Sequence, residues 1–158
     1  MLGSELELEI KVTDPRLHEW GLPTYQTELA AGIDLHACID APLAIEPQAP
    51  AQLVSSGLAV LMNEPNMAAL VLPRSGLGHK RGLVLGNSVG LIDADWTAPI
   101  AISVWSRLPP GSDPIIINPG DRIAQLVFVP ILRPRFRLVA AFSAETRRGD
   151  RGFGSTGR

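Results

Sequence analysis

Apolar and polar residues alternate along much of this chain, as they do in half-buried β-strands. From Glu5 to Val12 every second residue is aliphatic, and residues 33–39 repeat that pattern. A period of two places successive side chains on opposite faces of a strand. We therefore expect short strands at residues 5–12, 33–39, 57–62, 68–72, 83–85, 100–105, 115–117, 123–129 and 136–141.

Turn-forming residues separate these segments and leave little room for helices. The chain contains 14 prolines and 15 glycines, and a glycine inside a helix costs ~1 kcal/mol relative to alanine. In the proline-free segment from Arg74 to Ala98, glycine recurs every two to four residues, so we expect essentially no helix there. Short strands separated by turns in this way indicate a single all-β domain, a distorted jelly-roll sandwich or barrel.

Length and charge exclude several classes of protein. The 158 residues are enough for one buried core, and a net charge of −2 provides no basic field for direct nucleic-acid binding. The single cysteine, Cys38, fits a reducing compartment. No signal-peptide pattern opens the chain, and no apolar run approaches the ~18 residues of a membrane span. We therefore expect a cytoplasmic protein with no membrane partner.

The composition changes after Phe142. Residues 143–158 contain no Leu, Ile or Val, but they contain four arginines (147, 148, 151 and 158) and one aromatic residue, Phe153. Such a segment cannot form a core of its own. We expect a jelly-roll domain at 1–142 and a flexible C-terminal arm at 143–158. The arm is either a frayed terminus or a segment that closes over a phosphorylated, base-bearing ligand.

Two short segments carry candidate chemistry. Arg74, Ser75 and Gly76 offer a guanidinium, a hydroxyl and accessible backbone N–H groups, which suit phosphate oxygens. The alternative is an ordinary glycine-rich hairpin turn. Asp93 and Asp95 place two carboxylates close together, where one could activate a water molecule. The alternatives are two solvated turn residues or a pair of metal ligands.

Two further groups of polar residues require an explanation. Asp34, His36 and Cys38 share one face of an expected strand. They are either the ligands of a metal site or an ordinary polar face with a buried thiol. Gln125 lies in an apolar run, where its amide needs a partner if it is buried. It could equally be a surface residue on an edge strand.

Taken together, five segments resemble, in order and spacing, the five motifs of the trimeric dUTP pyrophosphatase family. They are Ala31–Ala37, Pro73–Lys80, Gly82–Asp95, Gly120–Leu126 and Arg148–Gly157. The match spans nearly the whole chain. It implies a homotrimeric jelly roll with three sites at subunit junctions, in which the arm of one subunit completes a site built by the others. It also implies Mg²⁺-dependent hydrolysis of dUTP to dUMP and pyrophosphate. This reaction keeps uracil out of DNA and supplies dUMP for dTMP synthesis.

The resemblance also implies roles for residues in the body of the chain. Asp93 would activate the water that attacks the α-phosphorus. Asn87 and the backbone around Leu91 and Ile92 would read the uracil edge, and Trp96 would stack on the deoxyribose. The other positions implied to bind substrate in this part of the chain are Arg74, Ser75, Gly76 and Gln125 near the phosphates, and Ala101. Mg²⁺ would be held chiefly by the triphosphate, with Asp34 acting at most through water.

Roles in the arm are implied in the same way. Phe153 would stack over the uracil, and Arg148, Ser155 and Thr156 would bind the γ-phosphate. Three residues depart from the usual family pattern: Trp96 replaces a tyrosine, Pro99 follows the hairpin, and Arg151 replaces a glycine.

Two other functions are compatible with the same fold. A dCTP deaminase would have a second serine after the Arg-Ser pair, whereas Gly76 follows Ser75 here. A regulatory protein that binds the nucleotide without cleaving it would keep the fold and lose turnover. The presence of Asp93, Arg148 and Phe153 favours the hydrolase.

Overall fold

The computed structural model describes residues 6–144 and 146. In these residues eleven short strands and two short helices succeed one another. They are β1 (Glu9–Val12), α1 (Leu17–Trp20), β2 (Ile33–His36), β3 (Leu43–Ile45), β4 (Gln52–Ser55), β5 (Leu58–Leu61), β6 (Met67–Pro73), η1 (Leu77–Arg81), β7 (Leu83–Leu85), β8 (Gly90–Ile92), β9 (Ala101–Ser106), β10 (Ile115–Ile117) and β11 (Arg122–Pro130).

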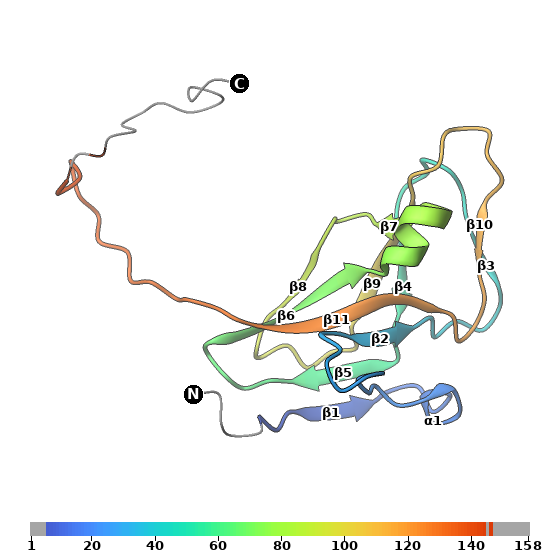
Figure 1. The fold of residues 1–158 in the computed structure, drawn as a ribbon, viewed down its shortest axis with the longest axis horizontal. Coiled ribbons are helices and arrows are strands. Elements are labelled where there is room, and N and C mark those ends of the chain that lie inside the picture. The colour runs from blue at the N-terminus through green and yellow to red at the C-terminus, as the bar shows by residue number, and fades with distance from the viewer. Residues whose placement is uncertain (1–5, 145, 147–158) are drawn as a thin grey trace.

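The strands form small antiparallel sheets around one core (Figure 1). The largest sheet has the order β2-β11-β6-β8, and a second has the order β4-β9-β7. Two further pairs, β1-β5 and β10-β3, complete the arrangement. Neighbours in the sheets are mostly distant in sequence, as in a jelly roll, so the structure confirms the expected all-β fold.

Aliphatic side chains fill the core, which agrees with an aromatic content of only 5%. On β9 the alternation places Ile102 and Val104 inside, both fully buried. Leu126 of β11 is also fully buried, between the strands β2 and β6 that flank it. Fully burying one such side chain stabilises the fold by about 1.5–3 kcal/mol. The apolar pattern of the sequence therefore provides most of the force that holds the sheets together.

Two expectations about secondary structure were wrong. The short helix η1 lies in the glycine-rich segment, where we expected none. Its carbonyl groups have an external partner, because the Arg107 guanidinium donates to the backbone oxygens of Gly78 and His79 at 3.1 and 3.0 Å. It ends at Gly82, whose φ of +78° suits glycine. Residues 136–141, expected as a strand, form none.

Residues 131–144 instead leave the body of the protein as an extended segment (Figure 1, orange to red). Leu132 and Phe136 are each 94% exposed, and Leu138 and Phe142 are similarly open to solvent. A strand needs a neighbour to satisfy its backbone hydrogen bonds. Ile131 N–H, at the start of the segment, donates to Asn66 O at 2.8 Å, but the described residues after it belong to no strand. Exposed apolar side chains in such a row mark a contact surface for another molecule.

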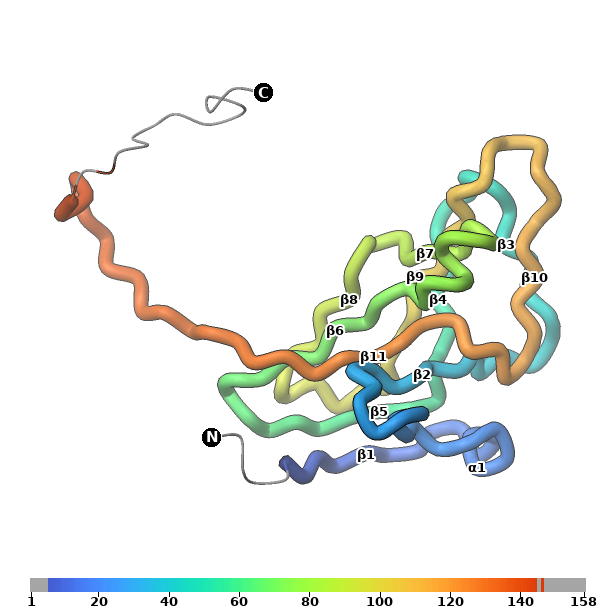
Figure 2. Tube along the Cα trace, in the orientation of Figure 1, coloured from blue at the N-terminus to red at the C-terminus, as the bar shows by residue number. Residues whose placement is uncertain are grey.

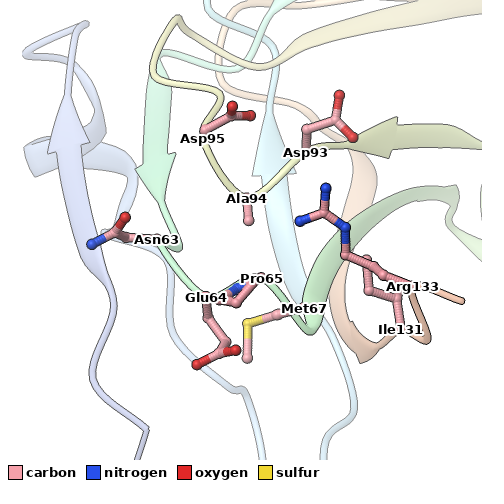
Figure 3. A pocket seen from close by; sticks show the side chains of 9 residues that line it. All are labelled: Asn63, Glu64, Pro65, Met67, Asp93, Ala94, Asp95, Ile131 and Arg133. Atoms are coloured by element: carbon pink, nitrogen blue, oxygen red, sulfur yellow. The ribbon is translucent and has the colours of Figure 1, made fainter. Parts of the chain in front are cut away.

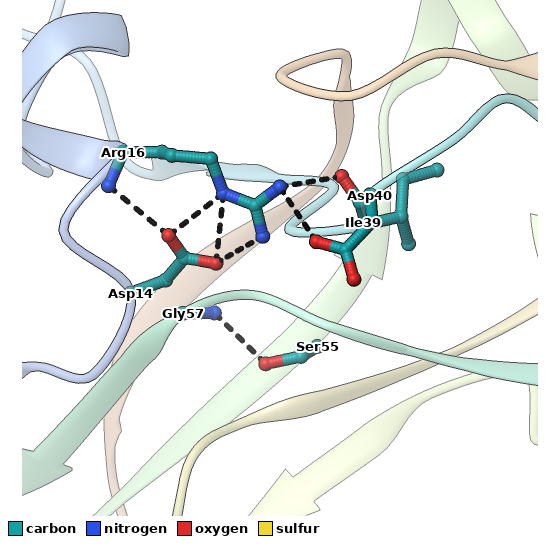
Figure 4. Close-up of polar contacts among 6 residues, drawn as sticks. All are labelled: Asp14, Arg16, Ile39, Asp40, Ser55 and Gly57. Carbon is teal, nitrogen blue, oxygen red and sulfur yellow. Dashed lines mark hydrogen bonds and ion pairs between the residues drawn. The ribbon is translucent and has the colours of Figure 1, made fainter.

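An ion-pair cluster fastens the N-terminal segment to the loop after β2 (Figure 4). The Arg16 side chain donates to Asp14 at 2.9 Å and to the backbone oxygen of Ile39 at 2.8 Å, and it also contacts Asp40. The hydrogen bonds from Arg16 lower the pKa of Asp14. Nearby, burial raises the pKa of the Cys38 thiol to about 11, so this thiol stays protonated and unreactive.

Of the helices in the described residues, neither has the length and apolar character needed to cross a membrane.

Candidate active site

Arg74, Asp34 and Arg122 form a charged cluster at one end of the largest sheet. Asp34 forms an ion pair with Arg74 Nε at 2.8 Å through one carboxylate oxygen and accepts a hydrogen bond from Arg122 Nη1 at 3.1 Å on the other. Arg74 Nη1 also donates to the Arg122 backbone oxygen at 3.2 Å. The Asp34 carboxylate is only 15% exposed, so it holds both guanidinium groups in fixed positions. Two cations around one anion leave a net positive site for phosphate.

A β-bulge in β11 places Arg122 in this cluster. Arg122 pairs with His36, but Ala124 pairs with Leu35, so Ile123 is the additional residue on β11. A bulge of this kind changes the direction of neighbouring side chains. We expected no role for Arg122, because a β-bulge produces no signal in the alternation of apolar residues.

Gln125 lies beside the same cluster. It is half-buried on β11, between β2 and β6, and donates to the Pro73 backbone oxygen at 2.9 Å. This hydrogen bond provides the partner that a buried amide needs, and the edge-strand interpretation was wrong. A Cβ atom at Gly32 would lie 3.2 Å from Gln125 Oε1, so the absence of a side chain at position 32 leaves room for the amide.

Ser75 and Gly76 follow Arg74 and lead into η1 rather than into a hairpin turn. Both are exposed, and a Cβ atom on Gly76 would meet nothing within 4 Å. Gly78 N–H is already bonded to Arg74 O at 2.9 Å. The backbone around positions 75 and 76 is therefore open to an anion, next to the guanidinium of Arg74.

The turn between β7 and β8, two strands of different sheets, carries the second group of site residues. Ser88 has a φ of +63°, and Val89 N–H donates to Asn87 O at 2.7 Å, which closes the tight turn. A Cβ atom on Gly90 would lie 2.9 Å from Val71 Cβ. Only glycine therefore lets the start of β8 lie so close to β6. Leu91 remains 65% exposed, on a surface that is open to a ligand.

Asp93 directly follows β8 and lines a pocket of about 490 Å³ with eight other residues (Figure 3). The pocket includes Glu64 and Asp95, and Arg133 enters it from the extended C-terminal segment. Figure 3 shows the Arg133 guanidinium pointing toward the side of the pocket that holds Asp93. The Asp93 carboxylate is exposed, as a group must be if it is to reach a water molecule or a substrate.

The charged cluster and Asp93 are far apart within one chain. The register of β6 and β8 pairs Ala69 with Ile92, so Asp93 is level with Ala68. Arg74, which directly follows β6, lies six residues beyond Ala68 along the chain. At about 3.3 Å per residue, Asp93 and Arg74 are therefore separated by roughly 20 Å. The structure therefore brings Arg74, Asp34 and Gln125 together, and it places Leu91 and Ile92 on β8 directly before Asp93, away from that cluster. Asn87 precedes the other end of β8, on the Val71 side of the register, and so lies away from Asp93.

The remaining expected site residues are more scattered. Trp96 is 49% exposed and donates its backbone N–H to Asp93 O at 3.1 Å, in the turn after β8. Ala101 is exposed at the start of β9, opposite Ser55. Four expected site residues lie outside the described part of the chain: Arg148, Phe153, Ser155 and Thr156.

Within residues 6–144 and 146, no three His, Cys, Asp or Glu side chains are grouped so that they could hold a metal ion. Asp34 uses both carboxylate oxygens for arginines. His36 packs against Trp20 with their ring centroids 6.3 Å apart, and burial lowers its pKa. These residues therefore do not form the three-ligand site that we considered at this face. Asp34 and His36 fit instead a Mg²⁺ ion that is held by substrate phosphates, because such an ion needs few protein ligands.

Comparison with known proteins identifies the family. The family model described as dUTPase matches residues 18–157. A curated relative from Coxiella burnetii (strain Dugway 5J108-111), the deoxyuridine 5'-triphosphate nucleotidohydrolase, is 53% identical over 96% of this chain and 97% of its own length.

Solved structures agree in fold. A mutant dUTPase of Staphylococcus bacteriophage 80alpha with dUpNHpp superposes with a TM-score of 0.79 at 24% identity, covering 96% of this chain and 99% of that one. A mutant dUTPase from phage phi11 of S. aureus, described with a structural Mg(II) ion, gives a TM-score of 0.72 at 22% identity, covering 87% and 99%. With the family model and the Coxiella relative both spanning most of the sequence, the chain belongs to the dUTPase family.

Proposed function

We propose that this protein hydrolyses dUTP to dUMP and pyrophosphate. The observation that carries the proposal is the exposed Asp93 carboxylate directly after β8. The exposed Leu91 of β8 marks a surface that can receive a base. The family match and the 53% identical nucleotidohydrolase support the same reaction.

In the proposed mechanism Asp93 accepts a proton from a water molecule, and the water oxygen forms a bond to the α-phosphorus. The bond from the α-phosphorus to the oxygen that bridges to the β-phosphorus breaks, and its electron pair leaves with pyrophosphate. A positioned general base typically contributes 10²–10⁴-fold to rate. Arg74, oriented by Asp34, and the open backbone at Ser75 and Gly76 neutralise the phosphate charge. Gln125 lies next to Arg74, within reach of the α-phosphate region.

The turn between β7 and β8, together with β8, selects the nucleobase in this proposal. Asn87 stands in the turn, and Leu91 and Ile92 follow on β8, so their backbone groups can pair with the polar edge of uracil. The contact of Gly90 with β6 makes the start of β8 rigid. A rigid strand rejects cytosine because a mismatched buried amide costs about 1–3 kcal/mol. The ring of Trp96 and the exposed Ala101 complete the proposed sugar-binding surface.

Mg²⁺ bound to the triphosphate would supply further charge neutralisation at the reacting phosphates. Asp34 would contact such an ion at most through water, because both of its oxygens already pair with arginine side chains. The phi11 dUTPase is described with a structural Mg(II) ion, which is consistent with Mg²⁺ taking part in this proposal.

We further propose that the working unit is a homotrimer. Asp93 and Arg74 of one chain are separated along β6, so a single triphosphate can meet both only if they come from different copies. The exposed apolar residues of segment 131–144 require a protein surface to cover them, which a neighbouring copy would provide.

The proposed division of the chain is a jelly-roll domain at 1–142 and a C-terminal arm at 143–158. In this proposal the arm closes over the bound nucleotide. Phe153 stacks on the uracil, and Arg148, Ser155 and Thr156 bind the γ-phosphate. Closing the arm excludes bulk water from the reacting phosphate. In the cytoplasm the enzyme would keep uracil out of DNA and supply dUMP for dTMP synthesis.

The experiment measures pyrophosphate release with Mg²⁺ from dUTP, dTTP, dCTP and UTP, for the wild type and for Asp93→Asn. Asp113→Asn, in an exposed loop, is the matched control. We expect release from dUTP alone, lost about 10²–10⁴-fold in Asp93→Asn and retained in the control. Release from none of the four nucleotides, with dUTP bound but uncleaved, would instead support a regulatory protein.

A further inference from the structure

The side chain of Trp20, the last residue of α1, lies against the turn between β10 and β11. A Cβ atom on Gly120 in that turn would lie 3.0 Å from Trp20 Cε2. Gly120 also has a φ of +83°, which suits glycine. Figure 2 shows α1 beside this turn. Because position 120 has no side chain, the turn rests directly on the indole ring.

The same ring also contacts the end of β2. The ring centroids of Trp20 and His36 are 6.3 Å apart, with an interplanar angle of 38°. His36 pairs with Arg122 in the strand register and follows Asp34 by two residues. Trp20 therefore touches both backbone segments that carry the Asp34–Arg122 ion pair.

Arg16 fixes the ring in its place. Its guanidinium carbon lies 5.4 Å from the centroid of the Trp20 ring. The same guanidinium donates to Asp14 and to the backbone oxygen of Ile39. A cation over the face of an aromatic ring attracts that ring, so the ion-pair cluster around Arg16 also limits the movement of the indole.

The cluster of Arg74, Asp34 and Arg122 needs such support, because open space lies beside it. A cavity of about 430 Å³ is lined by Trp20, Asp34, Gly120 and Arg122 together with other residues. The Arg122 side chain is 48% exposed. Packing thus covers only part of this guanidinium, and its position depends on the backbone that carries it.

Building on the proposed function, we propose that Trp20 is a positioning residue for the phosphate site. Its ring fixes the turn before Arg122 and the end of β2 after Asp34, so that these two side chains form the ion pair that orients Arg74. In this role Trp20 touches no substrate and acts through the cluster alone. It determines how tightly phosphates bind, and it leaves water activation by Asp93 and recognition of uracil unchanged.

Two probes separate this role from a purely structural one. Pyrophosphate reports on the phosphate cluster, whereas deoxyuridine, which carries no phosphate, reports on the base-binding surface. Loss of a merely structural ring would lower stability and weaken both probes. Loss of a positioning ring weakens pyrophosphate alone. Both probes are measured with Mg²⁺ as competitive inhibitors of dUTP hydrolysis.

The variants are Trp20→Leu, which removes the ring, and Trp20→Phe, which keeps a smaller one. Gly120→Ala disturbs the same contact from the other side and keeps the indole, so it replaces Trp20→Leu if that variant does not fold. Val60→Ala, a buried residue of β5 in a different sheet, is the control for a loss of stability. Thermal unfolding verifies that each variant is folded at the assay temperature.

In Trp20→Leu we expect the KM for dUTP and the inhibition constant of pyrophosphate to rise together by about tenfold, with a much smaller change in kcat. The inhibition constant of deoxyuridine should stay unchanged. Gly120→Ala should act in the same direction, and Trp20→Phe should recover most of the loss. Val60→Ala should lower the thermal midpoint without changing either inhibition constant.

A combination with Asp34→Asn tests whether Trp20 acts through the cluster. Once this carboxylate is neutralised, the ring has no ion pair left to position, so Trp20→Leu should raise the KM little further. Two independent tenfold effects would instead multiply to about a hundredfold.

Equal weakening of pyrophosphate and deoxyuridine in Trp20→Leu, or multiplied effects in the combination with Asp34→Asn, would overturn the proposal. Unchanged constants in folded Trp20→Leu and Gly120→Ala would overturn it as well. A wild type that hydrolyses no dUTP would instead contradict the proposed function. Calorimetric titration with pyrophosphate then decides on Trp20: weaker binding in Trp20→Leu supports its role, and equal or absent binding in both chains refutes it.

Discussion

Arg74 and Asp93 lie near opposite ends of β6. Asp93 shares its pocket with Met67, the first residue of that strand, whereas Arg74 follows the last residue. The proposed base and the proposed phosphate ligand are thus separated by the length of one strand. In the proposed trimer, a single triphosphate would therefore meet Asp93 of one copy and Arg74 of another.

The pairing of Asp34 with Arg74 predicts how Asp34→Asn behaves. Neutralising the carboxylate releases both guanidinium groups that it orients. We expect the KM for dUTP to rise about tenfold, equivalent to ~1.4 kcal/mol, with a smaller change in kcat. Steady-state kinetics over a range of Mg²⁺ concentrations checks this. If excess Mg²⁺ restores the KM, Asp34 acts through the metal and the positioning role is refuted.

The close contact of Gly90 with Val71 predicts the cost of Gly90→Ala. The added methyl group would lie 2.9 Å from Val71 Cβ and force the start of β8 away from β6. We expect a loss of about 1–3 kcal/mol in the free energy of unfolding, together with a higher KM for dUTP. Denaturant unfolding measures the first effect.

The control for this substitution is Val71→Ala, alone and combined with Gly90→Ala. Shortening Val71 makes room for the new methyl group, so the double variant should lose less stability than the two single losses added together. Strict additivity would show that the contact between these residues does not constrain β8.

Much of this architecture could be predicted from the sequence, because most strands bury one face. The alternation predicted β7 and β10 with their observed bounds and β11 to within a residue or so. It missed β3, β4 and β8, which are short and mix exposed with buried positions. It placed a strand at 136–141, where the apolar pattern is real but a neighbouring strand is absent from the body of the chain.

The motifs propose which residues form the candidate site but not how these residues are arranged. The resemblance implies roles for Asp93 and Arg74, which stay predictions, whereas the position of Arg122 depends on a bulge that only the strand register reveals. The distance between Asp93 and Arg74 likewise depends on how β8 pairs with β6. Long-range pairing of this kind leaves no local signal in a sequence.

The Asp14–Arg16 pair predicts a pH dependence of stability. The hydrogen bonds from Arg16 lower the pKa of Asp14 below its ordinary value of 3.8. The stabilisation is therefore complete above that value and is lost as the pH falls through the lower pKa of the folded state. Because the Arg16 side chain is 34% exposed, we expect a contribution of only about 1 kcal/mol.

Asp14→Asn tests this dependence. The variant should be less stable than the wild type at neutral pH, and the difference should disappear as the pH falls through the lowered pKa of Asp14. Urea unfolding at a series of pH values measures it. A difference that remains constant into acid would show that the pair does not act through its charge.

Deletion of residues 147–158 tests the proposed arm. The buried apolar residues that the structure describes all lie within the jelly-roll domain, so the truncated chain should fold with an unchanged thermal midpoint. Without the γ-phosphate and base contacts proposed for the arm, we expect turnover of dUTP to fall by at least about 10²-fold. Unchanged turnover in the folded truncation would refute the closing role.

The most direct test of the central claim is complementation between Asp93→Asn and Arg74→Gln. Each variant alone should be inactive, and the two chains are co-expressed with different tags and purified for both. If every site takes Asp93 and Arg74 from different neighbouring copies, each mixed trimer has both wild-type residues in one of its three sites, about a third of the sites. We therefore predict that about a third of wild-type dUTP hydrolysis returns in the doubly purified trimers. No activity in confirmed mixed trimers would contradict the account, because both residues would then have to act from the same chain.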